Sequence, residues 1–74
     1  DKIIYDELEQ RLEEKNIKNK ECIMIGNDLN NDIIPLKKRG FKTIYFTTSE
    51  DYSKYADYIV HKTRQLYEIF ENLI

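Results

Sequence analysis

The sequence is poor in the residues that cross-link small proteins. Its 74 residues include one cysteine, Cys22, and one histidine, His61, so no intrachain disulfide can form and a zinc site is not expected. There is no tryptophan, and the sequence contains only two glycines and one proline. A chain this short buries a limited share of its surface, so we expect one small domain.

A strong net charge and a long apolar run are also missing. Twelve basic and fourteen acidic side chains give a formal net charge of −2, which offers no electrostatic basis for binding nucleic acid or an acidic membrane. No apolar run reaches 18 residues and no signal-peptide pattern occurs, so we expect a cytoplasmic protein. Because the sequence begins with Asp1 and not Met, we expect it to be part of a longer chain.

Alternating helical and strand patterns predict an α/β fold. Apolar residues recur at helical spacing in the predicted helices, and short, nearly continuous apolar runs predict strands that are buried on both faces. The order α-β-α-β-β-α predicts parallel units in a short, Rossmann-like, three-layer fold. The predicted helices are residues 3–12, 32–39 and 63–74, and the predicted strands are residues 21–25, 41–46 and 56–60.

Polar residues follow the first predicted strand, at the sheet edge where function gathers in such folds. Gly26 lets the backbone turn as it leaves the strand, and Asp28 and Asp32 follow. If Asp32 opens the next helix, both carboxylates lie in one turn and can converge on Mg²⁺, which takes one or two protein carboxylates and keeps waters. On residue type alone, an ordinary turn in which Asp32 caps the helix is the simpler explanation.

The order of motifs along nearly the whole chain resembles the C-terminal part of the core domain of HAD-like (haloacid-dehalogenase-superfamily) hydrolases. In the fourth motif of that family, an apolar strand ends in Gly-Asp and a second Asp follows four or five residues after the first. Here that segment reads Glu21-Cys22-Ile23-Met24-Ile25-Gly26-Asn27-Asp28-Leu29-Asn30-Asn31-Asp32-Ile33. The next family segments resemble Lys38-Arg39-Gly40-Phe41-Lys42-Thr43-Ile44-Tyr45-Phe46 and Ala56-Asp57-Tyr58-Ile59-Val60, followed by a helix rich in Leu.

The resemblance implies a Mg²⁺-dependent phosphatase that acts on a phosphorylated small molecule through an aspartyl-phosphate. It implies Asp32 as a metal ligand, together with Asp28 or with Asn27, which stands where many relatives have Asp. The family's catalytic lysine precedes this region, and Lys2 lies near its position. The nucleophile strand and the substrate-selecting cap are absent from residues 1–74, so the isolated chain is expected to be inactive. The resemblance names no substrate, and it leaves a dehalogenase or a mutase open.

Two other kinds of protein fit the same pattern. One is a non-catalytic binding module, receiver-like or flavodoxin-like, although only one strand end is acidic here. The other is an assembly module that pairs with strands from a partner. In the family, the nucleophile strand lies beside the strand that runs here from Glu21 to Ile25, so we expect the rest of its own protein or another copy to cover that edge.

Three more polar residues follow the later strands. Thr47 and Thr48 end the second predicted strand near the same edge, where they either contact substrate or form a plain turn. His61 follows the third strand and is most simply a surface residue.

Overall fold

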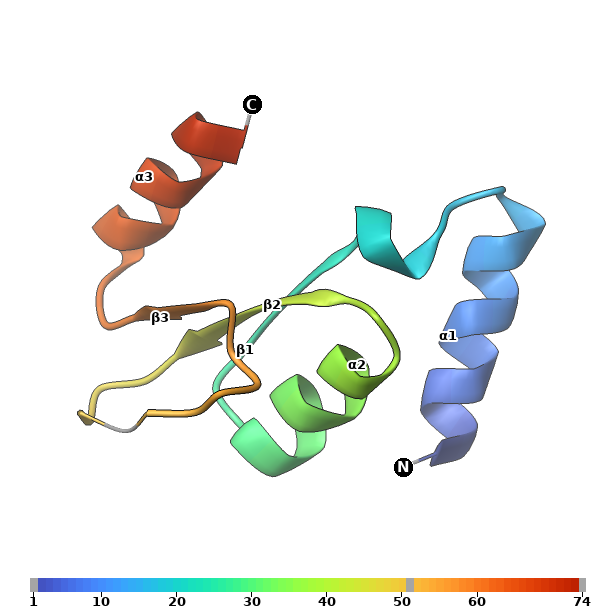
Figure 1. Ribbon diagram of the computed structural model, residues 1–74, viewed down its shortest axis with the longest axis horizontal. Helices are drawn as coiled ribbons and strands as arrows, with labels where there is room; N and C mark the ends of the chain where they lie inside the picture. Colours follow the sequence, from blue (N-terminus) through green and yellow to red (C-terminus); the bar gives the residue numbers. More distant parts are fainter. Residues whose placement is uncertain (1, 51, 74) are drawn as a thin grey trace.

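A computed structural model describes residues 2–50 and 52–73, so that Asp1, Asp51 and Ile74, the last residue of the predicted C-terminal helix, lie outside it. The predicted order of elements is confirmed (Figure 1). Helix α1 is followed by a short 3-10 turn, strand β1, a π-helical turn, helix α2, strands β2 and β3, and helix α3. The bounds are α1 Lys2–Glu14, the 3-10 turn Asn19–Glu21, β1 Ile23–Gly26, the π turn Leu29–Ile33, α2 Ile34–Lys38, β2 Lys42–Phe46, β3 Tyr58–Val60 and α3 Thr63–Leu73.

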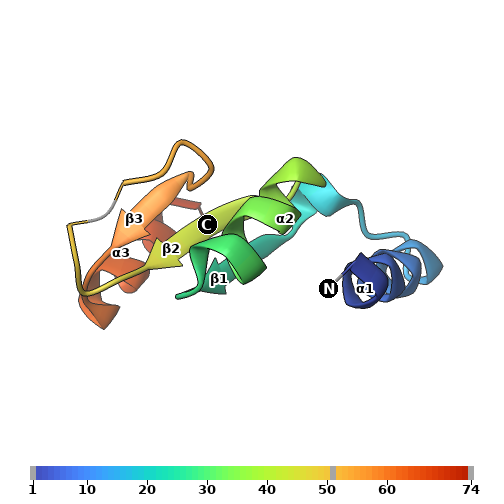
Figure 2. The same cartoon turned by 90° about the horizontal axis from the view of Figure 1, so that it is seen from below.

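The three strands form one parallel sheet in the order β1-β2-β3, which confirms the predicted fold class. Figures 1 and 2 show α2 and α3 on opposite faces of this sheet, with α1 to one side. Strand β2 lies in the middle, and its residues Thr43, Ile44 and Tyr45 are buried. The core therefore centres on β2, with Ile33 and Leu36 contributed by the segment between β1 and β2.

Helix α2 begins and ends where its proline and glycine permit. Pro35 stands in the first turn, where its missing N–H costs nothing. Gly40 has a φ of +94°, and the N–H groups of Gly40 and Phe41 donate to the carbonyls of Lys37 and Leu36, each at 3.0 Å. This is the Schellman arrangement, which ends a helix on a left-handed residue and here sends the chain into β2.

The predicted helix over residues 32–39 was wrong in its first turn. The N–H groups of Ile33 and Ile34 bond to carbonyls five residues earlier, those of Asp28 and Leu29. The chain therefore leaves β1 through a wide π turn before the α-helix starts. Such turns are rare and often lie at functional sites.

Helix α1 is largely exposed, and strand β1 is less buried than predicted. No residue of α1 is buried, and Ile3 and Ile4 are 75% and 62% exposed. Ile23 and Ile25 project from one face of β1 and are 37% and 39% exposed, and β1 is an edge strand with no neighbour among the described residues on its outer side. The predicted burial of this strand on both faces is therefore wrong within the described chain.

Polar contacts connect α1 to the rest of the structure. The guanidinium of Arg39 lies 2.8 Å from the carboxylate of Asp6 and 2.9 Å from that of Glu9, and it stacks over the ring of Tyr5. These two carboxylates raise the pKa of Arg39. No helix within residues 2–50 and 52–73 is both long and apolar enough to span a membrane.

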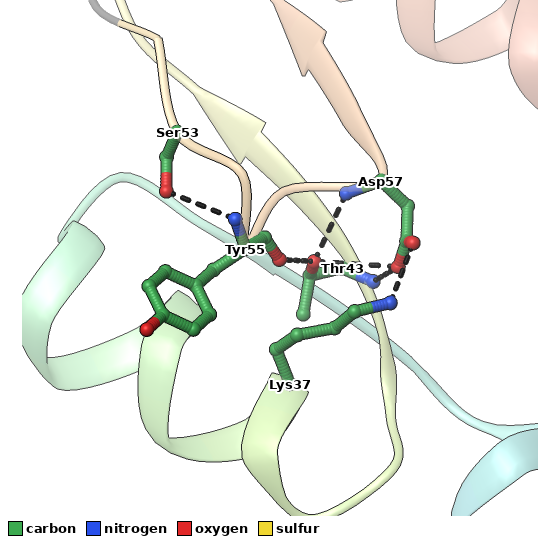
Figure 3. A network of polar contacts seen from close by, with 5 residues as sticks. All are labelled: Lys37, Thr43, Ser53, Tyr55 and Asp57. Carbon is green, nitrogen blue, oxygen red and sulfur yellow. Dashed lines mark hydrogen bonds and ion pairs between the residues drawn. The ribbon is translucent and has the colours of Figure 1, made fainter.

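A polar network at the amino ends of the strands links α2, β2 and β3 (Figure 3). One carboxylate oxygen of Asp57 accepts from the Nζ of Lys37 at 2.6 Å, and the other accepts from the N–H of Thr43 at 2.8 Å. The buried hydroxyl of Thr43 donates to the carbonyl of Tyr55 at 2.6 Å. Burial alone would raise the pKa of Asp57, but the bonds from Lys37 and Thr43 outweigh it and hold that pKa below its ordinary value.

We expect Asp57→Asn to lower the free energy of unfolding by about 1–3 kcal/mol at pH 7, because the carboxylate that Lys37 and Thr43 bind is lost. Urea unfolding measures this. A matched control is Glu7→Gln, which breaks only the exposed helical pair with Arg11 and should cost less than about 0.5 kcal/mol. Equal losses in the two variants would contradict the role assigned to Asp57.

The pH dependence follows from the direction of the pKa shift. Because the folded-state pKa of Asp57 is lowered, its contribution is complete above its ordinary pKa of 3.8. It is lost as the pH falls through the lowered folded-state pKa. The difference between wild type and Asp57→Asn should therefore shrink as the pH falls below 3.8, and not as it rises above neutrality.

Candidate functional site

The turn after β1 begins with Asp28, which caps it. Asp28 has an extended backbone, with φ −114° and ψ 104°. Its carboxylate accepts from the backbone N–H of Asn31 at 3.1 Å and from the side-chain amide of Asn31 at 2.8 Å. These two bonds lower the pKa of Asp28. The alternative that Asp32 caps the helix is therefore wrong, because the π turn places the cap four residues earlier.

Asp32 lies inside the π turn, over the end of β1. Its backbone N–H donates to the carbonyl of Asp28 at 2.8 Å, and its Oδ2 accepts from the backbone N–H of Asp28 at 3.3 Å. A Cβ at residue 26 would lie 2.7 Å from both the Cβ and the Oδ2 of Asp32. Gly26 is thus needed for this close approach, while among the glycines only Gly40 has a positive φ. The predicted reason for Gly26, a sharp turn, is replaced by a packing reason.

The carboxylate oxygens in this turn could supply part of the ligand set of a Mg²⁺ site. Asp32 has one carboxylate oxygen to which no described residue donates, while both oxygens of Asp28 are bonded to Asn31. Among residues 2–50 and 52–73, no three acidic, histidine or cysteine side chains come together to hold a metal. One or two carboxylates are enough to bind Mg²⁺, because this ion fills its remaining coordination positions with water or phosphate oxygens. They are too few for a metal that is coordinated by protein side chains alone.

Asn27 and Lys2 are the other two predicted site residues, and both are exposed. Asn27 is exposed and lines a hollow with Phe46, Thr47 and Thr48, at the carboxyl ends of β1 and β2. Lys2 is exposed at the start of α1 and makes no ion pair within the described part of the chain. One turn later on α1, the hydroxyl of Tyr5 donates to the carbonyl of Asn31, beside Asp32. The start of α1 is therefore joined to the acidic turn, and the role of Lys2 stays a prediction.

His61 has a structural contact that the sequence did not reveal. Its Nδ1 lies 2.8 Å from the carbonyl oxygen of Thr47, which joins the ends of β2 and β3. A carbonyl accepts only, so Nδ1 carries the proton in this contact. The nearest signal in the sequence was that Thr47 and His61 each end a strand of one parallel sheet, so that both must reach the same edge.

Comparison with known proteins relates the chain to a phosphatase. No protein-family model matches it. A protein of Pyrococcus furiosus named glyceraldehyde 3-phosphate phosphatase is 37% identical over 62 residues. The match covers 76% of this chain and 26% of that protein, so the chain spans about a quarter of the length of the curated relative it matches.

We expect Gly26→Ala to lower the free energy of unfolding by about 1–3 kcal/mol, because the new methyl group overlaps Asp32. A double-mutant cycle with Asp32→Gly, measured by urea unfolding, isolates that contact. The cost of Gly26→Ala should fall by at least about 1 kcal/mol once the side chain of Asp32 is removed. Additive losses would show that the two residues do not meet as described.

Proposed function

We propose that this chain is the C-terminal segment of the core domain of a HAD-like, Mg²⁺-dependent phosphatase that acts through an aspartyl-phosphate. The observation that carries the proposal is the placement of the Asp32 carboxylate over Gly26, at the carboxyl end of β1. The resemblance of residues 21–33 to the family's fourth motif and the similarity to a phosphatase support it independently.

Each polar residue of the turn has a proposed part in holding the metal. Asp32 binds Mg²⁺, and the backbone N–H of Asp28 orients its carboxylate. The second ligand is Asn27, through its amide oxygen, or Asp28, whose carboxylate Asn31 holds in place. When bound, the metal offsets the repulsion between the phosphate and the carboxylate nucleophile. That nucleophile belongs to a segment outside these 74 residues.

The open edge of β1 is the proposed place of the missing segment. The carbonyl of Cys22 accepts from the N–H of Lys42 in β2, and successive peptide groups of a strand alternate in direction. The N–H groups of Ile23 and Ile25 therefore point to the outer edge, where an unpaired row of donors and acceptors is a template for another strand. We propose that a strand from the rest of its own protein, carrying the nucleophile, pairs there, with a second copy of the chain as the alternative.

A phosphorylated small molecule is the proposed substrate. The relative is named for its action on glyceraldehyde 3-phosphate, which makes small phosphate esters the first compounds to test.

In the full-length protein, Asp32→Asn should lower Mg²⁺-dependent turnover at least about a hundredfold, the scale on which loss of one key electrostatic group acts. Phosphate release from glyceraldehyde 3-phosphate measures it. The matched control is Asp6→Asn on α1, which breaks one contact with Arg39 and should leave turnover within about twofold of wild type, as expected for an exposed ion pair.

Wild-type turnover in the Asp32→Asn protein would refute the metal assignment. If Asp32 is confirmed, a comparison of Asn27→Ala with Asp28→Ala identifies the second ligand, because the variant that weakens the apparent affinity for Mg²⁺ more has lost it.

A further inference from the structure

The hollow at the carboxyl ends of β1 and β2 adjoins the acidic turn. Its lining residues are Asn27, Phe46, Thr47 and Thr48, and we call it the strand-end hollow. Asn27 belongs both to this lining and to the turn that holds Asp28 and Asp32. A ligand whose phosphate lies at the acidic turn therefore has the strand-end hollow immediately beside it.

The backbone that carries the hollow is fixed from several directions. The N–H of Thr47 donates to the carbonyl of Val60 at 3.0 Å, and its carbonyl contacts the Nδ1 of His61 at 2.8 Å. The hydroxyl of Thr47 lies 2.9 Å from that of Ser49 and accepts from the Ser49 N–H at 3.2 Å. The backbone and the hydroxyl of Thr47 are therefore all hydrogen-bonded within the protein. These bonds fix the turn and so position the next residue, Thr48.

The side chain of Thr48, by contrast, does not take part in these hydrogen bonds. Its side chain is exposed, and no hydrogen bond ties its hydroxyl to another residue of the described chain. A hydroxyl can both donate to and accept from a ligand hydroxyl or carbonyl. The half-buried Phe46 supplies an apolar wall for the carbon atoms of such a ligand.

The charge of the lining narrows the ligand class. All four lining residues are neutral, so the strand-end hollow offers a phosphate or carboxylate group no cation to pair with. Hydroxyl, amide and aromatic groups together suit an uncharged, hydroxylated carbon chain.

We infer that the strand-end hollow binds the uncharged, hydroxylated part of a phosphate ester, with Thr48 as the residue that hydrogen-bonds its hydroxyl or carbonyl group. The inference rests on the proposed phosphatase function and assigns part of the substrate selection to the core, beside the strand ends. It makes Thr48 a specificity residue that takes no part in the chemical step.

A pair of esters with equal carbon number tests this in the full-length protein. Glycerol phosphate and propyl phosphate differ in the two hydroxyl groups that the hollow would recognise. Thr48→Val removes the side-chain hydroxyl but keeps the shape. We expect it to lower kcat/KM for glycerol phosphate by about three- to tenfold, mainly through KM, as loss of one hydrogen bond does. Propyl phosphate should be hydrolysed as by wild type, and Thr48→Ser should restore the preference.

The possible results distinguish a failure of this inference from a failure of the proposed phosphatase function. If Thr48→Val lowers kcat/KM for both esters equally, or for neither, the strand-end hollow does not select the hydroxylated group and the inference is overturned. If wild-type protein hydrolyses neither ester in the presence of Mg²⁺, the proposed function fails and the inference fails with it. A selective loss with rescue by Thr48→Ser supports both.

Discussion

The parallel pairing of β1 with β2 is the constraint on which the rest of the structure depends. The register sets Gly26 opposite Tyr45, so the two strands end together at one edge of the sheet. The acidic turn and the Thr47–Thr48 turn therefore begin side by side. The connection between the strands maintains this pairing, because Ile33 and Leu36 are buried and Gly40 returns the chain to the start of β2.

The amino ends of the strands carry the stabilising polar network, and their carboxyl ends carry the candidate site. At the amino ends, hydrogen bonds and an ion pair join Asp57 to Lys37 and Thr43, which connects α2, β2 and β3. At the carboxyl ends, the described residues leave one oxygen of Asp32 and the hydroxyl of Thr48 without an intramolecular donor or acceptor. Parallel sheets bind ligands beyond their carboxyl ends, so the uncommitted groups lie where a ligand would be expected. The ionic network at the other end stabilises the scaffold that holds them.

Local signals explain which parts of the structure the sequence predicts. The order of elements follows from apolar spacing, and the end of α2 follows from Gly40, because these features depend on residues close in the chain. The π turn and the approach of Asp32 to Gly26 are local, but apolar spacing does not distinguish a π turn from an α-helical one. The contacts of His61 with Thr47 and of Asp57 with Thr43 each join residues that are 14 apart in the chain, so no local pattern predicts them. The predicted burial of β1 on both faces was wrong for the described chain, because Ile23 and Ile25 on one face are 37% and 39% exposed. The outer edge of β1 also has no neighbour among the described residues, which fits the proposed missing strand.

Amide hydrogen exchange at β1 tests most directly whether another strand completes this edge. The N–H of Met24 points to β2, whereas those of Ile23 and Ile25 point outward, so Met24 serves as the internal reference. In the isolated 74-residue chain, Ile23 and Ile25 should exchange much faster than Met24. In the full-length protein, all three should exchange slowly, because a paired strand protects the outer amides. Fast exchange at Ile23 and Ile25 in the full-length protein would contradict the account.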